Sequence, residues 1–318
     1  MSDLLHVTPD NPMPAGAKAG KLGQRPGRQV RYATFPATGR PLKGTVILLS
    51  GRNETIEKYF ETVRDLSARG FTVAALDWRG QGGSDRLLRD PDRGFVRSFD
   101  QYVSDLELLF EEVVLPDCRA PFYLLGHSTG GLVALLAAPR LLNRVRRMVL
   151  TAPLLGLVGY PLRQANIHRA ATALTLAGLG RVYFGGGPKR PHRMDFEDNP
   201  LTSDPDRFHR NRTLLETFPK LSLGGPTAAW VRAACRAIRT VSEPGFMAQM
   251  RIPTLFIAAG RDRVVSTPAI EDYASRLPSG ALVTIDRARH EILQEADRFR
   301  EAALAAFDAF VPGSDTGI

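Results

Sequence analysis

Continuous apolar runs alternate along most of the chain with segments in which apolar residues recur at helical spacing. Runs such as 45–49 and 71–76 are typical of strands that are buried on both faces. Further strands are expected at 29–38, 122–125, 148–151, 253–258 and 281–285, and helices at 56–66, 99–113, 270–277 and 291–311. Strands that alternate with helices predict an α/β fold with a parallel, doubly wound sheet.

The alternation stops between residues 153 and 245, where Gly, Pro and Arg are frequent and no buried strand can be recognised. Because this break lies between two strands, the inserted segment is expected at the carboxyl edge of the sheet, where open α/β folds bind ligands. We therefore expect a mostly helical cap at 153–245 over a core made of 29–152 and 246–318. Residues 1–28, rich in Pro, Gly and Ala, are expected to form a loose or wrapped-around arm.

The pentapeptide Gly126–Gly130 reads Gly-His-Ser-Thr-Gly and follows an apolar run, while helix formers follow it. A serine between a strand and a helix in this pattern sits on a sharp, strained turn, and small neighbours keep the crossing elements clear of it. Its hydroxyl is then exposed next to a helix N-terminus, which favours developing negative charge. The pattern predicts a nucleophile at Ser128, with an ordinary turn as the alternative interpretation.

A serine nucleophile needs a base, and the base needs a carboxylate that orients it. Among the six histidines, His290 is the one that follows a late strand and comes after the serine in the chain. Asp262 likewise follows a strand, which gives the order Ser, Asp, His. Asp286, at the end of the last strand, is the second candidate for the carboxylate.

Two backbone N–H groups are expected to stabilise the oxyanion. One belongs to Thr129, the residue after the nucleophile. The other should come from the loop after the first buried strand, and Arg52 is our choice there. The glycines at 80–83 also follow a strand, but loop residues follow them instead of a helix, so they do not form a dinucleotide-binding turn. No cofactor and no metal are expected.

The charge balance limits the choice of partners. The chain has 42 Lys and Arg against 33 Asp and Glu, a formal net charge of +9. Basic residues permit binding to nucleic acid, but no basic–aromatic interleaving or DNA-binding motif is recognisable, so we expect no nucleic-acid partner. The alternatives are peripheral contact with an anionic membrane surface and a merely solvated arginine-rich surface.

The two cysteines lie far apart, and no apolar run reaches the length of a membrane span. The first residues lack the basic and apolar regions of a secretory signal. These features lead us to expect a cytoplasmic protein.

The motifs together resemble the α/β-hydrolase superfamily, and within it the bacterial lysophospholipase and monoacylglycerol-lipase branch. The matching stretches are 51–54, 77–82, 126–131, 199–204, 224–227, 260–262 and 289–291. The resemblance implies an eight-stranded, mostly parallel sheet with a helical cap, a triad of Ser128, His290 and Asp262, and hydrolysis of esters of single-chain lipids. Many relatives carry His-Gly at the oxyanion loop, where this chain has Ser50–Gly51.

Three functions remain to be compared. A cofactor-independent serine hydrolase for a lysophospholipid or monoacylglycerol is favoured. A carboxylesterase for small esters is the second interpretation, because fold and triad do not determine the substrate. A non-catalytic binding protein on the same fold is the third, and it would be expected to lack a triad residue, whereas none is missing here.

Overall fold

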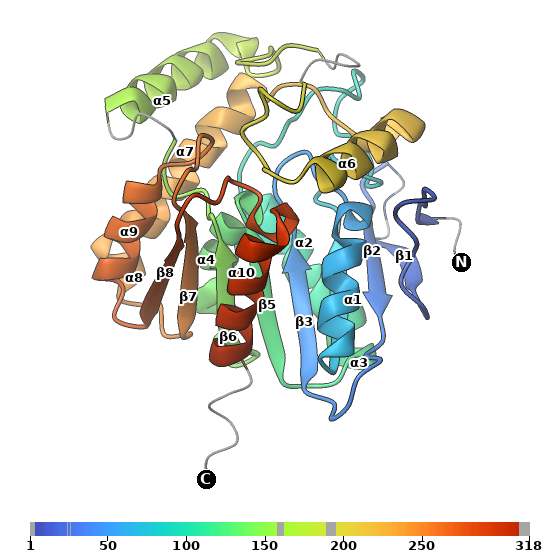
Figure 1. Cartoon of the computed structure of the whole chain (residues 1–318). Coiled ribbons are helices and arrows are strands. Elements are labelled where there is room, and N and C mark those ends of the chain that lie inside the picture. The colour runs from blue at the N-terminus through green and yellow to red at the C-terminus, as the bar shows by residue number, and fades with distance from the viewer. Residues whose placement is uncertain (1–3, 24, 26, 158–161, 189–194, 312–318) are drawn as a thin grey trace.

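A computed structural model describes residues 4–23, 25, 27–157, 162–188 and 195–311 (Figure 1). Its centre is an eight-stranded sheet in the order β1-β2-β4-β3-β5-β6-β7-β8. From β4 to β8 neighbouring strands are parallel, while β1 and β2 add an antiparallel edge. The strands are β1 Lys18–Leu22, β2 Val30–Phe35, β3 Gly44–Leu49, β4 Phe71–Leu76, β5 Phe122–His127, β6 Val145–Thr151, β7 Thr254–Ala259 and β8 Gly280–Ile285. The expected mostly parallel α/β sheet is confirmed.

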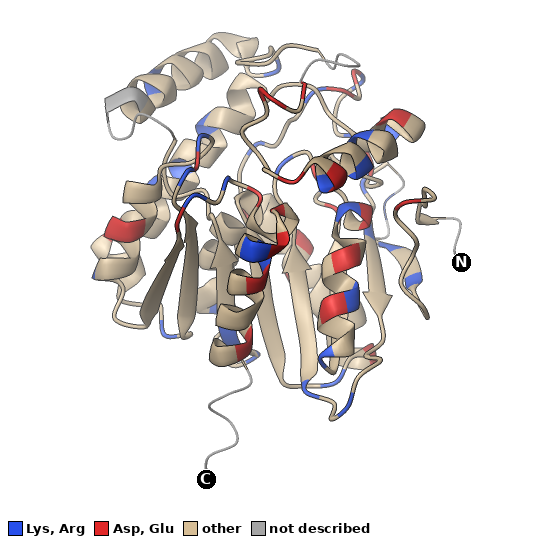
Figure 2. Ribbon diagram, in the orientation of Figure 1, with Lys and Arg blue, Asp and Glu red and all other residues tan. Residues whose placement is uncertain are grey.

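Helices cover both faces of this sheet. In Figure 1, α1 and α10 lie in front of the strands, and α2 and α4 lie behind them. The central strands β3 and β5 are fully buried and carry no Lys, Arg, Asp or Glu, whereas the surrounding helices and loops carry many (Figure 2). The helices of the core are α1 Phe60–Ala68, α2 Asp100–Leu109, α3 Leu115–Asp117, α4 Thr129–Leu141, α9 Thr267–Arg276 and α10 Asp297–Phe310.

Within the segment 153–245, called the cap below, α5 (Leu162–Leu174) and α6 (Pro205–Thr217) lie over the carboxyl ends of the strands at the top of Figure 1, while α7 (Ala228–Ser242) runs down from there beside the sheet. Its described residues form helices and loops and contribute no strand to the sheet. The longest helix, α7, has a buried apolar face that packs on α4 and joins the hydrophobic core through Trp230 and Ile238. The helices are α5 Leu162–Leu174, α6 Pro205–Thr217, α7 Ala228–Ser242 and α8 Pro244–Met247, with a π-helical turn at Thr175–Leu179.

Two local features were not resolved by the sequence. Within the N-terminal arm, which was expected to be loose or wrapped around, Lys18–Leu22 pairs with β2 and buries Ala19 and Leu22. The closing helix begins at Asp297 and not at 291, because the Glu295 carboxylate accepts hydrogen bonds from Arg289 N–H and Ser203 N–H and so holds the preceding residues in a short 3₁₀ turn and a loop.

Candidate active site

Ser128 occupies a strained turn between β5 and α4. Its φ is 50° and its ψ is −113°, a conformation that a non-glycine residue rarely adopts. The neighbouring glycines allow the helix to cross close by: a Cβ on Gly130 would lie 2.1 Å from Leu49 O, and one on Gly126 would lie 2.9 Å from Gly131 Cα. The turn therefore presents the serine hydroxyl at the carboxyl edge of the sheet.

Ser128, His290 and Asp262 form one chain of hydrogen bonds. His290 Nε2 lies 3.1 Å from Ser128 Oγ, and His290 Nδ1 lies 2.7 Å from Asp262 Oδ2. The backbone N–H groups of Val264 and Val265 donate to Asp262 Oδ1 at 2.7 and 2.9 Å. The structure thus brings together the three side chains that the sequence proposed, from the ends of β5, β7 and β8.

The Asp262 carboxyl group is held in its ionised form. Burial alone would raise its pKa, but hydrogen bonding and charge from His290 and the two backbone N–H groups lower the pKa below its usual 3.8. Asp286, the second candidate, points into solvent with 89 % of its side chain exposed and contacts Arg287 at 3.6 Å. It is not a partner of His290.

The two expected oxyanion donors lie at the ends of neighbouring strands. Thr129 is the first residue of α4, where N–H groups have no intrahelical partner. Arg52 follows β3, which pairs in parallel with β5. Among the described residues, neither backbone N–H donates a hydrogen bond. Both are therefore available to an oxygen atom that approaches Ser128.

A buried ionic cluster, which the sequence did not predict, stands beside the oxyanion loop. Lys58 Nζ lies 2.7 Å from Glu54 Oε1 and 2.6 Å from Glu291 Oε1. Glu54 Oε2 also accepts a hydrogen bond from Tyr59 at 2.6 Å and one from Gly51 N–H. The cluster joins the loop that carries Arg52 to the residue after His290. The two glutamates belong to the matching stretches 51–54 and 289–291, but Lys58, which joins them, lies outside both.

The groups of this cluster differ in their protonation. Burial would raise the pKa of Glu54, but Lys58, His127 and the hydrogen bonds from Lys58 and Tyr59 outweigh it and lower that pKa to about 2. Burial raises the pKa of Glu291, which shares the same lysine. Burial also lowers the pKa of His127 to about 4, so this imidazole is neutral at pH 7. His127 Nδ1 lies 3.1 Å from Thr151 O, while its Nε2 is buried and has no hydrogen-bond partner in the described structure.

Cap residues hold the loop that carries His290. The Arg289 guanidinium donates to Asn199 O at 3.0 Å and to Thr202 O at 2.8 Å. The N–H of Glu291 donates to Leu201 O at 2.8 Å. The stretches 199–204 and 289–291, far apart in the sequence, therefore meet beside the triad.

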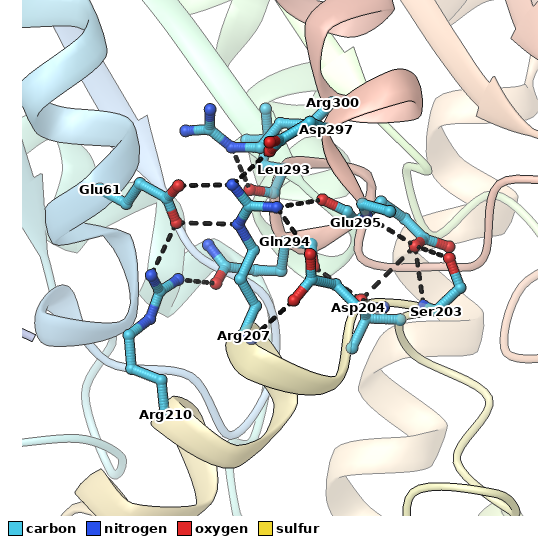
Figure 3. Close-up of polar contacts among 12 residues, drawn as sticks. Glu61, Ser203, Asp204, Arg207, Arg210, Leu293, Gln294, Glu295, Asp297 and Arg300 are labelled. Carbon is cyan, nitrogen blue, oxygen red and sulfur yellow. Dashed lines mark hydrogen bonds and ion pairs between the residues drawn. The ribbon is translucent and has the colours of Figure 1, made fainter. Parts of the chain in front are cut away.

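Helix α6 of the cap is fixed to the core by the charged residues drawn in Figure 3. Arg207 Nη2 lies 2.6 Å from Glu61 Oε1 and 2.7 Å from Asp297 Oδ1, and Arg207 Nη1 lies 2.9 Å from Asp204 Oδ2. Arg210 Nη1 contacts the same Glu61 carboxylate at 2.7 Å. One carboxylate of α1 thus binds two arginines of α6.

Two cavities lie near these groups. One, of about 420 Å³, is enclosed mainly by apolar side chains, and the other, of about 780 Å³, has a mixed lining. Leu154, whose N–H donates to Ser128 O at 3.0 Å, lines the smaller cavity together with Trp230. Asn53, Glu54 and Glu291 line the larger one. The smaller cavity is an apolar site connected to the serine through Leu154, and the larger one is a site of mixed polarity beside the oxyanion loop.

In the described part of the chain, no group of three or more His, Cys, Asp or Glu side chains is placed to hold a metal ion. Nor does any described helix combine the length and apolar character needed to cross a membrane.

Fold and site geometry together define the α/β-hydrolase class, in which a strand–serine–helix turn faces a histidine and an acid at the ends of later strands. Residues 40–297 match the model of the Hydrolase_4 family, described as serine aminopeptidase, S33. The chain belongs to this family, and it is a carboxylic ester hydrolase.

Individual relatives agree with this assignment. The chain is 33 % identical over 291 residues to lysophospholipase L2 of Escherichia coli K12, covering 88 % of this chain and 83 % of that protein. It is 30 % identical over 268 residues to a probable lysophospholipase L2 of Haemophilus influenzae, covering 84 % and 83 %. A Saccharomyces cerevisiae monoglyceride lipase, crystallised as a soluble variant with a substrate analogue, matches the fold with a TM-score of 0.71 at 18 % identity, covering 92 % and 94 %.

Proposed function

We propose that the protein hydrolyses carboxylic esters of single-chain lipids, lysophospholipids or monoacylglycerols, through an acyl-enzyme on Ser128. The observation that carries the proposal is the hydrogen-bonded chain from Ser128 through His290 to Asp262, placed beside an apolar cavity. Relatives named lysophospholipase L2 and monoglyceride lipase support the lipid class of the substrate.

Each residue has a defined part in the proposed reaction. Ser128 Oγ attacks the acyl carbonyl while His290 Nε2 takes its proton, and Asp262 stabilises the imidazolium that forms. The N–H groups of Thr129 and Arg52 donate to the oxyanion. His290 then returns the proton to the leaving alcohol, and a water molecule, activated by the same histidine, releases the fatty acid from the serine.

The smaller cavity is the proposed acyl site. Its wall includes Leu157, Ile167 and Ile238, and a volume of about 420 Å³ accommodates a chain of moderate length. Each methylene group of the acyl chain that is buried against the apolar wall adds about 0.8 kcal/mol to the binding free energy. Activity is therefore expected to rise with acyl length until the cavity is filled.

The cap also supports the proposal of contact with an anionic membrane surface. Leu176 and Leu179 expose 75 % and 47 % of their surface on the turn that follows α5. Burial lowers the pKa of His168 in α5, and the nearby positive charges of Arg239, Arg232 and Arg236 in α7 lower this pKa further. Exposed leucines next to arginines are the composition that binds anionic interfaces.

The test compares the wild-type protein with Ser128→Ala on p-nitrophenyl esters of graded length, lysophosphatidylcholine and monoolein. We expect wild-type activity to rise from short to medium or long chains, and the variant to lose about 10⁴-fold or more in turnover while its circular dichroism is retained. A flat or falling profile beyond butyrate would favour the small-ester carboxylesterase. Turnover retained in Ser128→Ala would contradict the proposed nucleophile, and a wild type inactive on all esters would favour a binding protein.

A further inference from the structure

The side chain of Arg52 extends toward the cap, away from the backbone N–H that is expected to bind the oxyanion. Its Nη2 donates to Gly224 O at 2.5 Å, and its guanidinium carbon lies 5.5 Å from the centre of the Trp230 ring. Gly94 supplies the remaining wall, because a Cβ there would lie 2.6 Å from Nη2. The guanidinium is thus held in place by a carbonyl, an aromatic ring and a glycine, all uncharged.

Arg52 has no carboxylate partner among the described residues, unlike the buried cations Arg31 and Lys58. Arg31 contacts Glu57 and Asp77, and Lys58 contacts two glutamates. Arg52 Nε is shielded from solvent and lacks a hydrogen-bond partner in the described structure. Burial lowers the pKa of Arg52 to about 10, so the group is still charged at pH 7. An uncompensated, partly desolvated cation is costly for the free protein, and an anionic ligand removes that cost.

Arg52 also stands between the two cavities described above. Trp230, on which its guanidinium rests, lines the apolar cavity, whereas Gly224 and Asn53 line the larger one. The backbone N–H of Arg52 is the proposed donor to the ester oxygen. In a lysophospholipid the glycerol backbone alone separates the ester from the phosphate. A single molecule can therefore place its carbonyl at the backbone of Arg52 and its phosphate near the side chain.

We propose that the Arg52 guanidinium binds the phosphate of the substrate, with the acyl chain in the apolar cavity and the headgroup directed into the larger one. This inference rests on the proposed function and narrows it from single-chain lipid esters to lysophospholipids. Arginine suits this role because its planar fork donates two parallel hydrogen bonds to phosphate oxygens. Nη2 carries two N–H groups and donates one of them to Gly224 O, so its second N–H and those of Nη1 are the donors left for phosphate.

The test uses two substrates with the same acyl chain, 1-oleoyl-lysophosphatidylglycerol and 1-oleoylglycerol, in the same neutral mixed micelles. The measured quantity is kcat/KM for the lysophosphatidylglycerol divided by kcat/KM for the oleoylglycerol. A substitution that disturbs the backbone donor affects both substrates, so this effect cancels in the ratio. Hydrogen bonds to charged groups contribute about 1.5–3 kcal/mol, so Arg52→Gln should lower this ratio about 10- to 100-fold. Arg52→Lys, which keeps the charge without the fork, should lower it less.

Two further variants make the result specific. Gly94→Ala keeps the charge but crowds Nη2, and it should shift the ratio in the same direction even where Arg52→Gln folds poorly. Arg251→Gln removes an exposed arginine that precedes β7, at the end of the sheet opposite the cap, and should leave the ratio unchanged. A ratio unchanged in both Arg52→Gln and Gly94→Ala, with both substrates hydrolysed by the wild type, would overturn the phosphate site alone. A wild type that hydrolyses neither substrate would overturn the proposed function.

A second series separates the lipid headgroup from free phosphate as the occupant. Inorganic phosphate is added to the lysophosphatidylglycerol assay at an ionic strength matched with chloride. Competition in the wild type that disappears in Arg52→Gln would assign the site to phosphate from either source. A changed substrate ratio without such competition would assign it to the lipid headgroup.

Discussion

Asp262 and Asp286 follow neighbouring strands, yet their surroundings are opposite. Asp262 accepts hydrogen bonds from His290 and two backbone N–H groups, whereas Asp286 is solvated. Asp262→Asn removes the negative charge that stabilises the imidazolium and favours the wrong tautomer of His290. We expect turnover on p-nitrophenyl butyrate to fall about 10³- to 10⁴-fold. Asp286→Asn is the matched control and should stay close to wild type, and a loss of similar size there would contradict the assignment.

Glu54 acts on the oxyanion loop through hydrogen bonds and not through the reacting atoms. Its carboxylate fixes the N–H of Gly51, one residue before Arg52, and balances the charge of Lys58. We expect Glu54→Gln to lower kcat about 10- to 100-fold at nearly constant KM, because a small displacement of the oxyanion donor weakens transition-state binding. Steady-state kinetics of the variant provide the measurement.

Two companions distinguish this positioning role from loss of fold. Glu54→Asp, which keeps the charge, should restore part of kcat, and Glu111→Gln, at an exposed position behind the sheet, should change nothing. A fall in unfolding free energy with unchanged kcat in Glu54→Gln would show that the cluster is structural only.

At the scale of an element, the attachment of helix α6 to the core depends on charged contacts. Glu61 of α1 contacts both Arg207 and Arg210 of α6. Glu61→Gln weakens both contacts, and we expect the amides of α6 to exchange with solvent about 10-fold faster, which corresponds to about 1.4 kcal/mol of local stability. Glu216→Gln breaks an exposed pair within the same helix and should have a much smaller effect. Equal exchange in the two variants would contradict the anchoring role.

The same contact predicts how the attachment of α6 depends on pH. Burial would raise the pKa of Glu61, but hydrogen bonds from Arg207 and the charges of Arg300 and Arg210 lower it to about 2. A carboxylate with a lowered pKa stabilises the folded state above its unfolded pKa of 4.5, and this contribution is lost as the pH falls toward 2. Amide exchange in α6 should therefore accelerate in acid more in the wild type than in Glu61→Gln, relative to each protein at neutral pH.

Elements with a regular pattern could be predicted from the sequence, and those defined by distant partners could not. The strands from β2 to β8 and the placement of Ser128, Asp262 and His290 follow from apolar runs and from where each run ends. Strand β1 was missed because a short edge strand buries few of its residues. The cluster of Glu54, Lys58 and Glu291 was missed because its residues come from the turn before α1 and the loop after β8. A contact between such distant segments leaves no periodic pattern in the sequence.

At the scale of the whole molecule, the net charge of +9 and the exposed leucines of the cap predict binding to anionic membranes. We expect the protein to cosediment with phosphatidylglycerol vesicles and not with phosphatidylcholine vesicles, and to dissociate as salt is raised. Leu176→Asp should weaken this binding about 10-fold, since it removes an apolar anchor worth about 1.5 kcal/mol or more.

Leu42→Asp provides the matched control. Leu42 is 40 % exposed and precedes β3, at the end of the sheet opposite the cap. If both leucine variants bind anionic vesicles equally well, the cap is not the contact surface and the basic charge acts without it.

The strand order of the sheet also sets when during synthesis the enzyme can become active. β7 and β8 are the last two strands in the described part of the chain. They lie next to each other at one edge of the sheet, and the residues that follow them supply Asp262 and His290. If Ser128 and His290 act as proposed, a nascent chain that has completed β1 to β6 carries the nucleophile without its base, because residue 290 must leave the ribosome and β8 must dock before the base is in place. On the proposed mechanism, translation itself would therefore delay ester hydrolysis until both strands and the loops after them have been made.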